Sequence, residues 1–146
     1  DTKIQPQQRL DAARDRNRTY LAVYHLATGK WTQLANDSLQ VTLSDDARRA
    51  LGTNSVEYAI PQFWGEGATD VYLVDPTTAA RTLIAKKLDG QAQLSPGGNY
   101  VTFFQEGQWH AYATATGKRV NLTGAIANIK FQDEEFDSPD IPPPYG

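Results

Sequence analysis

The groups that a hydrolase needs for catalysis are not brought together by any motif in this chain. A serine hydrolase carries its nucleophile on a sharp turn, normally Gly-x-Ser-x-Gly, with a histidine and an acid within hydrogen-bonding reach. The sequence has no such pentapeptide, and its nearest approach, Gly52-Thr53-Asn54-Ser55, lacks the spacing. It also has no cysteine, which excludes a thiol nucleophile, a disulfide scaffold and a cysteine zinc site. We therefore predict no catalytic residue in this chain.

Metal and cofactor chemistry is predicted to be absent as well. The two histidines, His25 and His110, are far apart, and neither has another ligand type at a metal-binding spacing. The richest acidic cluster is 133–135, Asp-Glu-Glu, extended by Asp137 and Asp140. Its oxygen spacing matches no EF-hand loop, and mutual repulsion favours a solvated connection. We predict neither a metal site nor a cofactor.

Three tryptophans offer the alternatives of a binding platform and of packing between sheets. Trp31 follows a Thr-Gly turn and Trp109 precedes an alternating, strand-like run. Packing is the expected role for large side chains in stacked sheets. Trp64 lies in a longer segment between two strand-like runs, so it is the best candidate for a contact outside the core.

Length and charge narrow the class of protein. The 146 residues suffice for about one domain, and 40% of them are hydrophobic. There are 14 basic against 17 acidic residues and no basic stripe, which argues against a nucleic-acid partner. No apolar run approaches the roughly 20 residues of a membrane span. The chain has no methionine and ends at Pro-Pro-Pro-Tyr-Gly, so we expect it to be a piece of a longer protein.

Two turn motifs alternate along the chain. Ala-Thr-Gly-Lys occurs at 27–30 and again at 115–118, and a degenerate copy lies at 77–80. The second motif, centred on Leu-Ser, occurs at 41–46 and at 92–97. Thr-Gly and Pro-Gly-Gly provide the positive φ that tight hairpins require, and the serine side chain of the second motif is expected to bond to its own turn.

Short β-branched or aromatic-rich runs flank these turns and read as strands. The expected strands are 20–24, 31–34, 39–43, 48–51, 71–74, 82–86, 92–94, 100–104, 109–112 and 119–122, with 126–131 opening a further unit. Residues 8–16 form either a short helix or the end of a preceding strand. Four strands per unit at a spacing of roughly 40–50 residues is typical of propeller blades.

The predicted fold class is therefore all-β, a partial β-propeller of four-stranded antiparallel blades. It comprises about two full blades with partial ones on either side; a β-sandwich is the alternative. Residues 1–19 are assigned to an N-terminal segment, 20–146 to the blades, and 54–69 to an inserted loop. An incomplete ring leaves sheet edges exposed, so self-association through those edges is expected.

The segment 94–100, Leu-Ser-Pro-Gly-Gly-Asn-Tyr, followed by two strands and Ala-Thr-Gly-Lys, resembles a repeat of the N-terminal propeller in the prolyl oligopeptidase (S9) family of serine peptidases. TolB-type periplasmic propellers carry a similar repeat. Segments 15–24, 70–75, 131–139 and 143–146 also look like parts of large bacterial S9 members, so the resemblance covers about residues 15–146. The chain departs from the repeat at Gly97, His25 and Ala113, where the family commonly has Asp.

The resemblance implies a non-catalytic role. In that family a propeller covers an α/β-hydrolase domain and limits access to short or unstructured peptides. The implied partners are the hydrolase domain of the parent protein and its peptide substrate, and the implied location is the periplasm or outside the cell. By analogy with the dipeptidyl branch, Glu134 and Glu135 would bind a peptide's amino terminus, with Trp64 as a further contact. The alternative is a TolB-like or lactonase-like propeller that binds a partner protein.

Overall fold

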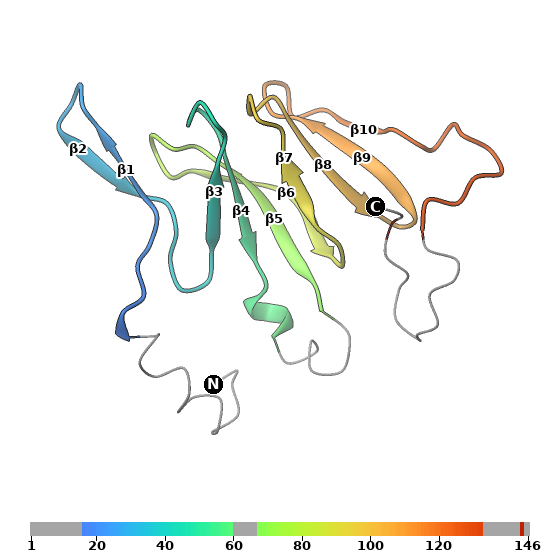
Figure 1. Ribbon diagram of the computed structural model, residues 1–146, viewed down its shortest axis with the longest axis horizontal. Helices are drawn as coiled ribbons and strands as arrows, with labels where there is room; N and C mark the ends of the chain where they lie inside the picture. The colour runs from blue at the N-terminus through green and yellow to red at the C-terminus, as the bar shows by residue number, and fades with distance from the viewer. Residues whose placement is uncertain (1–15, 60–66, 133–143, 145–146) are drawn as a thin grey trace.

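The computed structural model describes residues 16–59, 67–132 and 144, and this part of the chain forms three antiparallel β-sheets (Figure 1). Sheet A contains β1 (Ala22–His25) and β2 (Lys30–Gln33). Sheet B contains β3 (Gln40–Leu43), β4 (Ala50–Asn54), β5 (Thr69–Val74) and β6 (Arg81–Leu88). Sheet C contains β7 (Ala92–Leu94), β8 (Tyr100–Gln105), β9 (Gln108–Ala113) and β10 (Arg119–Asn121). A short 3-10 helix, η1 (Val56–Tyr58), follows β4.

Sheets B and C each order their four strands as they occur in the chain, so each is a meander of consecutive hairpins. This is the blade pattern that the sequence predicts, and the all-β fold class with four-stranded antiparallel sheets is confirmed. The observed strands begin and end within three residues of the expected ones.

The strand expected at 126–131 is wrong. Asn121 Oδ1 accepts hydrogen bonds from the backbone N–H groups of Thr123 and Gly124, and the N–H of Ile126 donates to the Thr123 carbonyl. These bonds fold the chain into turns directly after β10. Asn128 then has φ of 61°, which lies in the left-handed region and interrupts any extended strand.

The two Ala-Thr-Gly-Lys copies adopt the same turn. Gly29 and Gly117 have φ of 64° and 70°, and their N–H groups donate to the carbonyls of His25 and Ala113 at 2.8 and 2.9 Å. The hydroxyl of Tyr24 lies 3.7 Å from the position a Cβ would take on Gly29. A left-handed backbone conformation explains why glycine recurs at this point.

The serines of the second motif also have equivalent contacts. The backbone N–H groups of Ser44 and Ser95 donate to the carbonyls of Arg49 and Tyr100. In return each serine Oγ accepts a hydrogen bond from the N–H of the same partner, at 3.2 Å from Arg49 and 3.1 Å from Tyr100. The predicted role of these serines in closing their own turns is confirmed.

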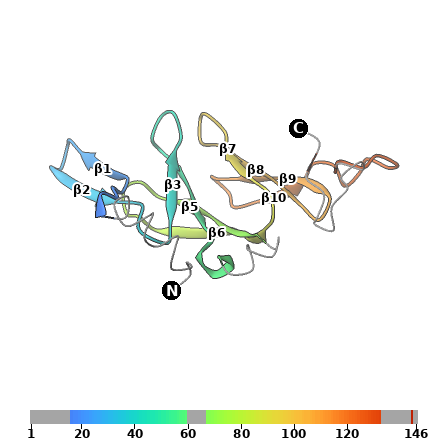
Figure 2. The ribbon, with the colours of Figure 1, turned by 60° about the horizontal axis from the view of Figure 1, so that its bottom comes forward.

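Sheets A and B pack through aliphatic side chains. Leu34 and Leu39, which flank the connection between β2 and β3, are buried with Ala50 and Val74 of sheet B. Side chains alternate between the faces of a strand, so β1 turns Val23 toward this cluster. Figure 2 shows the three sheets following one another in chain order.

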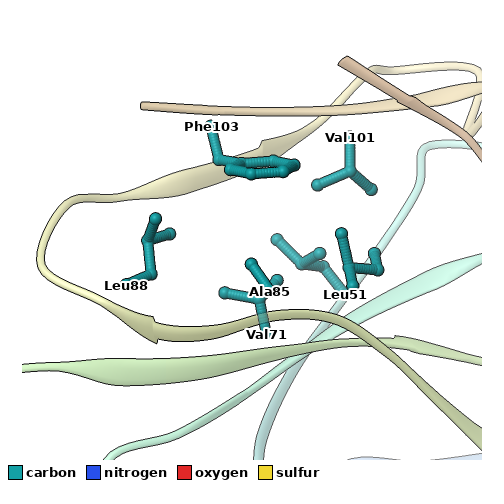
Figure 3. Packing of buried hydrophobic residues seen from close by; sticks show 7 residues of the cluster. Leu51, Val71, Ala85, Leu88, Val101 and Phe103 are labelled. Carbon is teal, nitrogen blue, oxygen red and sulfur yellow. The ribbon is translucent and has the colours of Figure 1, made fainter. Parts of the chain in front are cut away.

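Sheets B and C pack around an aromatic ring. Val101 and Phe103 of β8 face a cluster of sheet B residues that includes Leu51, Val71 and Leu88 (Figure 3). The sheets are also joined at their turns, because the N–H of Asp45 donates to the Pro96 carbonyl at 2.9 Å. The core is thus divided into two layers, each lying between neighbouring sheets.

Candidate functional site

The residues proposed from the sequence to bind substrate, Trp64, Glu134 and Glu135, lie outside the described residues. Their role therefore stays a prediction. The inserted loop in which Trp64 lies connects β4 to β5, and η1 is its described beginning.

Within the described residues, the other two tryptophans do not lie between two sheets. Trp31 pairs with Tyr24 across β1 and β2, and the two side chains are 66% and 60% exposed. They lie on the face of sheet A opposite Val23, so sheet B does not cover them. Trp109 makes an edge contact with Phe104, its cross-strand neighbour, with ring centroids 5.4 Å apart. Sequence could not distinguish these positions from buried ones, because both residues occupy ordinary strand sites.

A buried carboxylate that sequence reasoning missed lies at the start of β5. Asp70 is 6% exposed, and its Oδ1 accepts hydrogen bonds from the Tyr58 hydroxyl at 2.7 Å and the Lys87 N–H at 2.9 Å. The Tyr72 hydroxyl makes a longer contact of 3.5 Å with Oδ2. Lys87 can reach Asp70 because β5 and β6 shift register here and Lys87 has φ of 51°.

The electrostatics of this cluster keep its tyrosines protonated. The hydrogen bond to Asp70 is the main reason that the pKa of Tyr58 rises to about 12. The pKa of Tyr72 is also raised, first by burial and then by the charge of Asp70. The groups that donate hydrogen bonds to Asp70 belong to η1, β5 and β6, so the carboxylate holds these elements together. It fixes η1 and the β6 irregularity to β5. An aspartate inside a strand-like run is the one signal that could have found it, since strands disfavour Asp.

His110 is buried in the layer between sheets B and C. Its ring stacks on Phe103 at 5.5 Å between centroids, and Arg119 Nε donates to its Nδ1 at 3.3 Å. The Arg119 guanidinium also lies 4.8 Å from the centre of the Phe103 ring. Burial, followed by the positive charge of Arg119, lowers the pKa of His110. The neutral imidazole thus acts as a packing group.

His25 lies in the other layer and joins sheets A and B. Its Nε2 is 3.2 Å from Thr32 Oγ1, and that hydroxyl donates to the Thr77 carbonyl at 3.0 Å. The structure therefore places the two histidines in different layers. Across residues 16–59, 67–132 and 144, no group of three or more histidine or acidic side chains is arranged to hold a metal ion. Nor is any helix in this part long and apolar enough to cross a membrane.

Comparisons with known proteins find likenesses of structure only. No family model matches the chain, and no curated protein matches it. TolB from Acinetobacter baumannii is similar at 21% identity and a TM-score of 0.43, over 73% of this chain and 27% of that protein. The tricorn protease is similar at 14% identity and a TM-score of 0.45, over 77% of this chain and 11% of the protease. The chain thus spans a minor part of either protein. With both TM-scores below 0.5, the fold class rests on the strand order described above.

Proposed function

We propose that this chain is a non-catalytic propeller segment of a prolyl oligopeptidase-family serine peptidase, and that it limits access to a hydrolase domain outside the chain. The observation that carries the proposal is the way in which nucleophilic and basic side chains are used. Ser44, Ser95, His25 and His110 are all engaged in closing turns or packing sheets. Two consecutive four-stranded blades whose serine and histidine side chains make structural hydrogen bonds act as a scaffold.

A scaffold of this kind restricts access by holding its turns in a fixed row. Asp45 of sheet B donates its N–H to the Pro96 carbonyl of sheet C, which ties two neighbouring turns together. Gly98 brings the same turns into close contact, since a Cβ there would lie 3.0 Å from Arg49 Cβ and 3.2 Å from Ser44 Cβ. In this proposal, an extended peptide passes the fixed row of turns more easily than a folded chain does. At the opposite end of the sheets, Asp70 anchors η1, the described beginning of the connection between β4 and β5.

The partners in this proposal are the hydrolase domain of the parent protein and its peptide substrate. Glu134 and Glu135 would bind the amino terminus of the peptide, with Trp64 as an apolar contact. A free amino terminus is a cation, and paired carboxylates provide the charge-assisted hydrogen bonds that hold one.

Sequencing the source gene beyond the codon for Gly146 tests the proposal most directly. We expect further blades, then a Gly-x-Ser-x-Gly elbow followed by an acid and a histidine. Replacing the elbow serine by alanine should abolish peptidase activity of the full-length protein. A stop codon after a few more blades would overturn the peptidase function. It would leave the second candidate, a TolB-like or lactonase-like module that binds a protein, with which the same sheets are compatible.

The gating role has its own test in the full-length protein. Gly98→Val should loosen the row of turns, because Gly98 has φ of 68° and no room for a side chain. Cleavage of a long or folded substrate should then rise relative to cleavage of a short peptide. Gly97→Ala is the matched control, because the Cβ would meet only the Asn99 side chain at 3.4 Å. An unchanged ratio of long to short substrates in Gly98→Val would contradict gating.

A further inference from the structure

Strand β6 forms one border of sheet B and pairs on one side only. Its partner is β5, and no strand lies on its other side in the described part of the chain. Figure 2 shows β6 and β3 at opposite borders of the sheet. β6 has eight residues, whereas β2 and β10, the last strands of sheets A and C, have four and three. It therefore offers a longer run of backbone for pairing than they do.

The hydrogen bonds of the hairpin show which backbone groups of β6 point outward. The N–H of Asp75 donates to the Ala80 carbonyl at 2.9 Å, so these two residues form a hydrogen-bonded pair. In an antiparallel ladder such pairs alternate with pairs that share no hydrogen bond. Arg81 and Leu83 belong to pairs of the second kind, so their N–H and C=O groups point away from β5. These groups are available to an added strand.

Neighbouring sheets leave this border open because they stack on the faces of sheet B. The two core clusters lie on those faces and join sheet B to A and to C. Further sheets stacked on A or C in the same way would lengthen the row without reaching the border of B. Two side chains do reach it, near its ends. Thr32 Oγ1 donates to the Thr77 carbonyl before β6, and Gln105 Nε2 lies 3.5 Å from the Lys86 carbonyl.

The border is basic in a chain with a net charge of −3. Arg81, Lys86 and Lys87 are exposed, and no acidic residue lies between Asp75 and Asp89 in the sequence. The salt bridges of the described residues involve none of these three basic side chains. An acidic segment is thus attracted to this border, whereas a basic segment is repelled.

Two features restrict what can pair with β6. Lys87 has φ of 51° and donates its N–H to Asp70 Oδ1, so the extended backbone ends there. Pairing of two β6 strands from two copies of this chain would bring basic side chains close together, which is unfavourable. The edge is therefore suited to a segment of opposite charge rather than to a second copy of itself.

We propose that the edge of β6 binds an extended acidic segment of a partner protein, which adds to sheet B as a further strand. Backbone hydrogen bonds to Arg81 and Leu83 hold the segment, and its carboxylates pair with the basic side chains of Arg81, Lys86 and Lys87. The site uses none of the residues to which gating is assigned. The two proposals can therefore fail separately.

Fluorescence anisotropy with a labelled peptide tests the proposal in the full-length protein. The probe is an acetylated and amidated hexapeptide of alternating glutamate and valine, because six residues span about 20 Å when extended, the reach of β6 from Arg81 to Lys86. A hexapeptide of alternating lysine and valine should not bind at the same concentrations. A glutamate–valine probe with methylated backbone nitrogens keeps its charge but cannot donate hydrogen bonds, so it should bind about tenfold more weakly.

Variants of the protein separate hydrogen bonding from charge. Leu83→Pro removes an outward N–H and leaves the hydrogen bonds between β5 and β6 intact. Lys86→Glu reverses one charge of the border. Each should weaken binding of the glutamate–valine probe about tenfold or more. Lys118→Glu, at an exposed lysine directly before β10, changes the net charge by the same amount and is the matched control. It should bind the probe like the wild type.

Four results would overturn the proposal. The glutamate–valine probe could fail to bind. Equal binding of the methylated probe would show a general anion-binding surface, of the kind that nucleic acids use. Equal losses in Lys86→Glu and Lys118→Glu would show an effect of net charge alone, and unchanged binding in Leu83→Pro would place the peptide elsewhere. Circular dichroism establishes that each variant is folded. Should Leu83→Pro unfold, the methylated probe with the wild type decides whether backbone hydrogen bonds hold the peptide.

Discussion

The layer between sheets A and B and the layer between sheets B and C occupy equivalent positions but are filled differently. Aligning Ser44 with Ser95 puts Gly52 in register with Phe103 and Leu39 with Gly90. Between A and B, Leu39 is fully buried and its Cδ1 lies 3.2 Å from where a Cβ on Gly52 would be. Between B and C, Phe103 is fully buried and Gly90 meets only a backbone oxygen.

The two layers show that the repeat determines where the core lies. It does not determine which repeat position provides the large side chain that fills the core. In one layer the connection before β3 fills the space above a glycine. In the other, a phenylalanine on the second strand of the sheet fills it. Packing density requires only that the summed volume match the gap. Each layer therefore has its own weak point, which the following variants locate.

Phe103→Ala should have the largest effect, because it empties the layer between B and C. We expect a loss of about 3–5 kcal/mol in the free energy of unfolding, since a cavity remains where the ring was. The variant also removes the ring contacts to His110 and Arg119. Urea denaturation measures the loss. Leu83→Ala, at an exposed site, is the control, and an equal loss there would contradict a core organised around Phe103.

Gly52→Ala should damage the layer between A and B by overfilling it. The new Cβ would lie 2.9 Å from Val74 Cγ2, which is too close, and we expect a loss of about 1–3 kcal/mol. Gly90→Ala is the matched variant in the other layer. Its Cβ would be 3.6 Å from the Phe104 carbonyl oxygen, so it should change stability by less than about 1 kcal/mol.

A double-mutant cycle sharpens this prediction. Adding Leu39→Ala to Gly52→Ala makes room for the new methyl group, so the double variant should lose less stability than the sum of the two single variants. Additive losses would show that Leu39 does not fill the space above Gly52.

Tyr58→Phe tests the hydrogen bond between η1 and Asp70 of β5, which lies outside both core clusters. It removes one hydrogen bond to a carboxylate at a partly exposed site, so we expect a loss of about 1 kcal/mol. Because the folded pKa of Tyr58 is raised from 10.0 to about 12, the bond stabilises the fold fully below pH 10. That stability is lost as the pH rises toward 12. Ultraviolet titration of tyrosinate should show a late-titrating group in the wild type that is missing from Tyr58→Phe.

The pH dependence that His110 gives to stability should be the smallest effect, and it appears only in acid. The folded pKa of His110 is lowered from 6.5, so below that pH the unfolded chain binds a proton more readily than the folded one. Stability should therefore fall as the pH drops below 6.5. Thermal melting across this range should be flatter in His110→Gln. His25→Gln, in the other layer, should keep the part of the slope that belongs to His110.

The strands and turns could be predicted because local chemistry determines them. Gly29 needs its left-handed conformation and Ser44 closes its own turn, so short motifs report both. The end of the last sheet could not be predicted in this way. Residues 126–131 include apolar side chains that favour a strand, yet the hydrogen bonds that Asn121 Oδ1 accepts from Thr123 and Gly124 turn the chain before one can form.

The positions and contacts of the candidate site residues were harder to predict from the sequence. Asp70 becomes an anchor only because a register shift between β5 and β6 brings Lys87 to it, and no local pattern reports such a shift. Trp31 is exposed because no described sheet packs on its face of sheet A. The sequence of β1 and β2 does not report how the sheets stack. The substrate-binding role of Trp64, Glu134 and Glu135 remains a prediction.

Each layer of the core joins sheets that follow one another in the sequence. Sheet B can therefore settle against sheet A while sheet C is still being synthesised, and sheet C finds its docking surface already formed. The most distant pairing that either layer requires spans only a neighbouring unit, which keeps the entropy cost of loop closure low. The polypeptide is thus suited to folding from its N-terminal end as it leaves the ribosome, one sheet at a time.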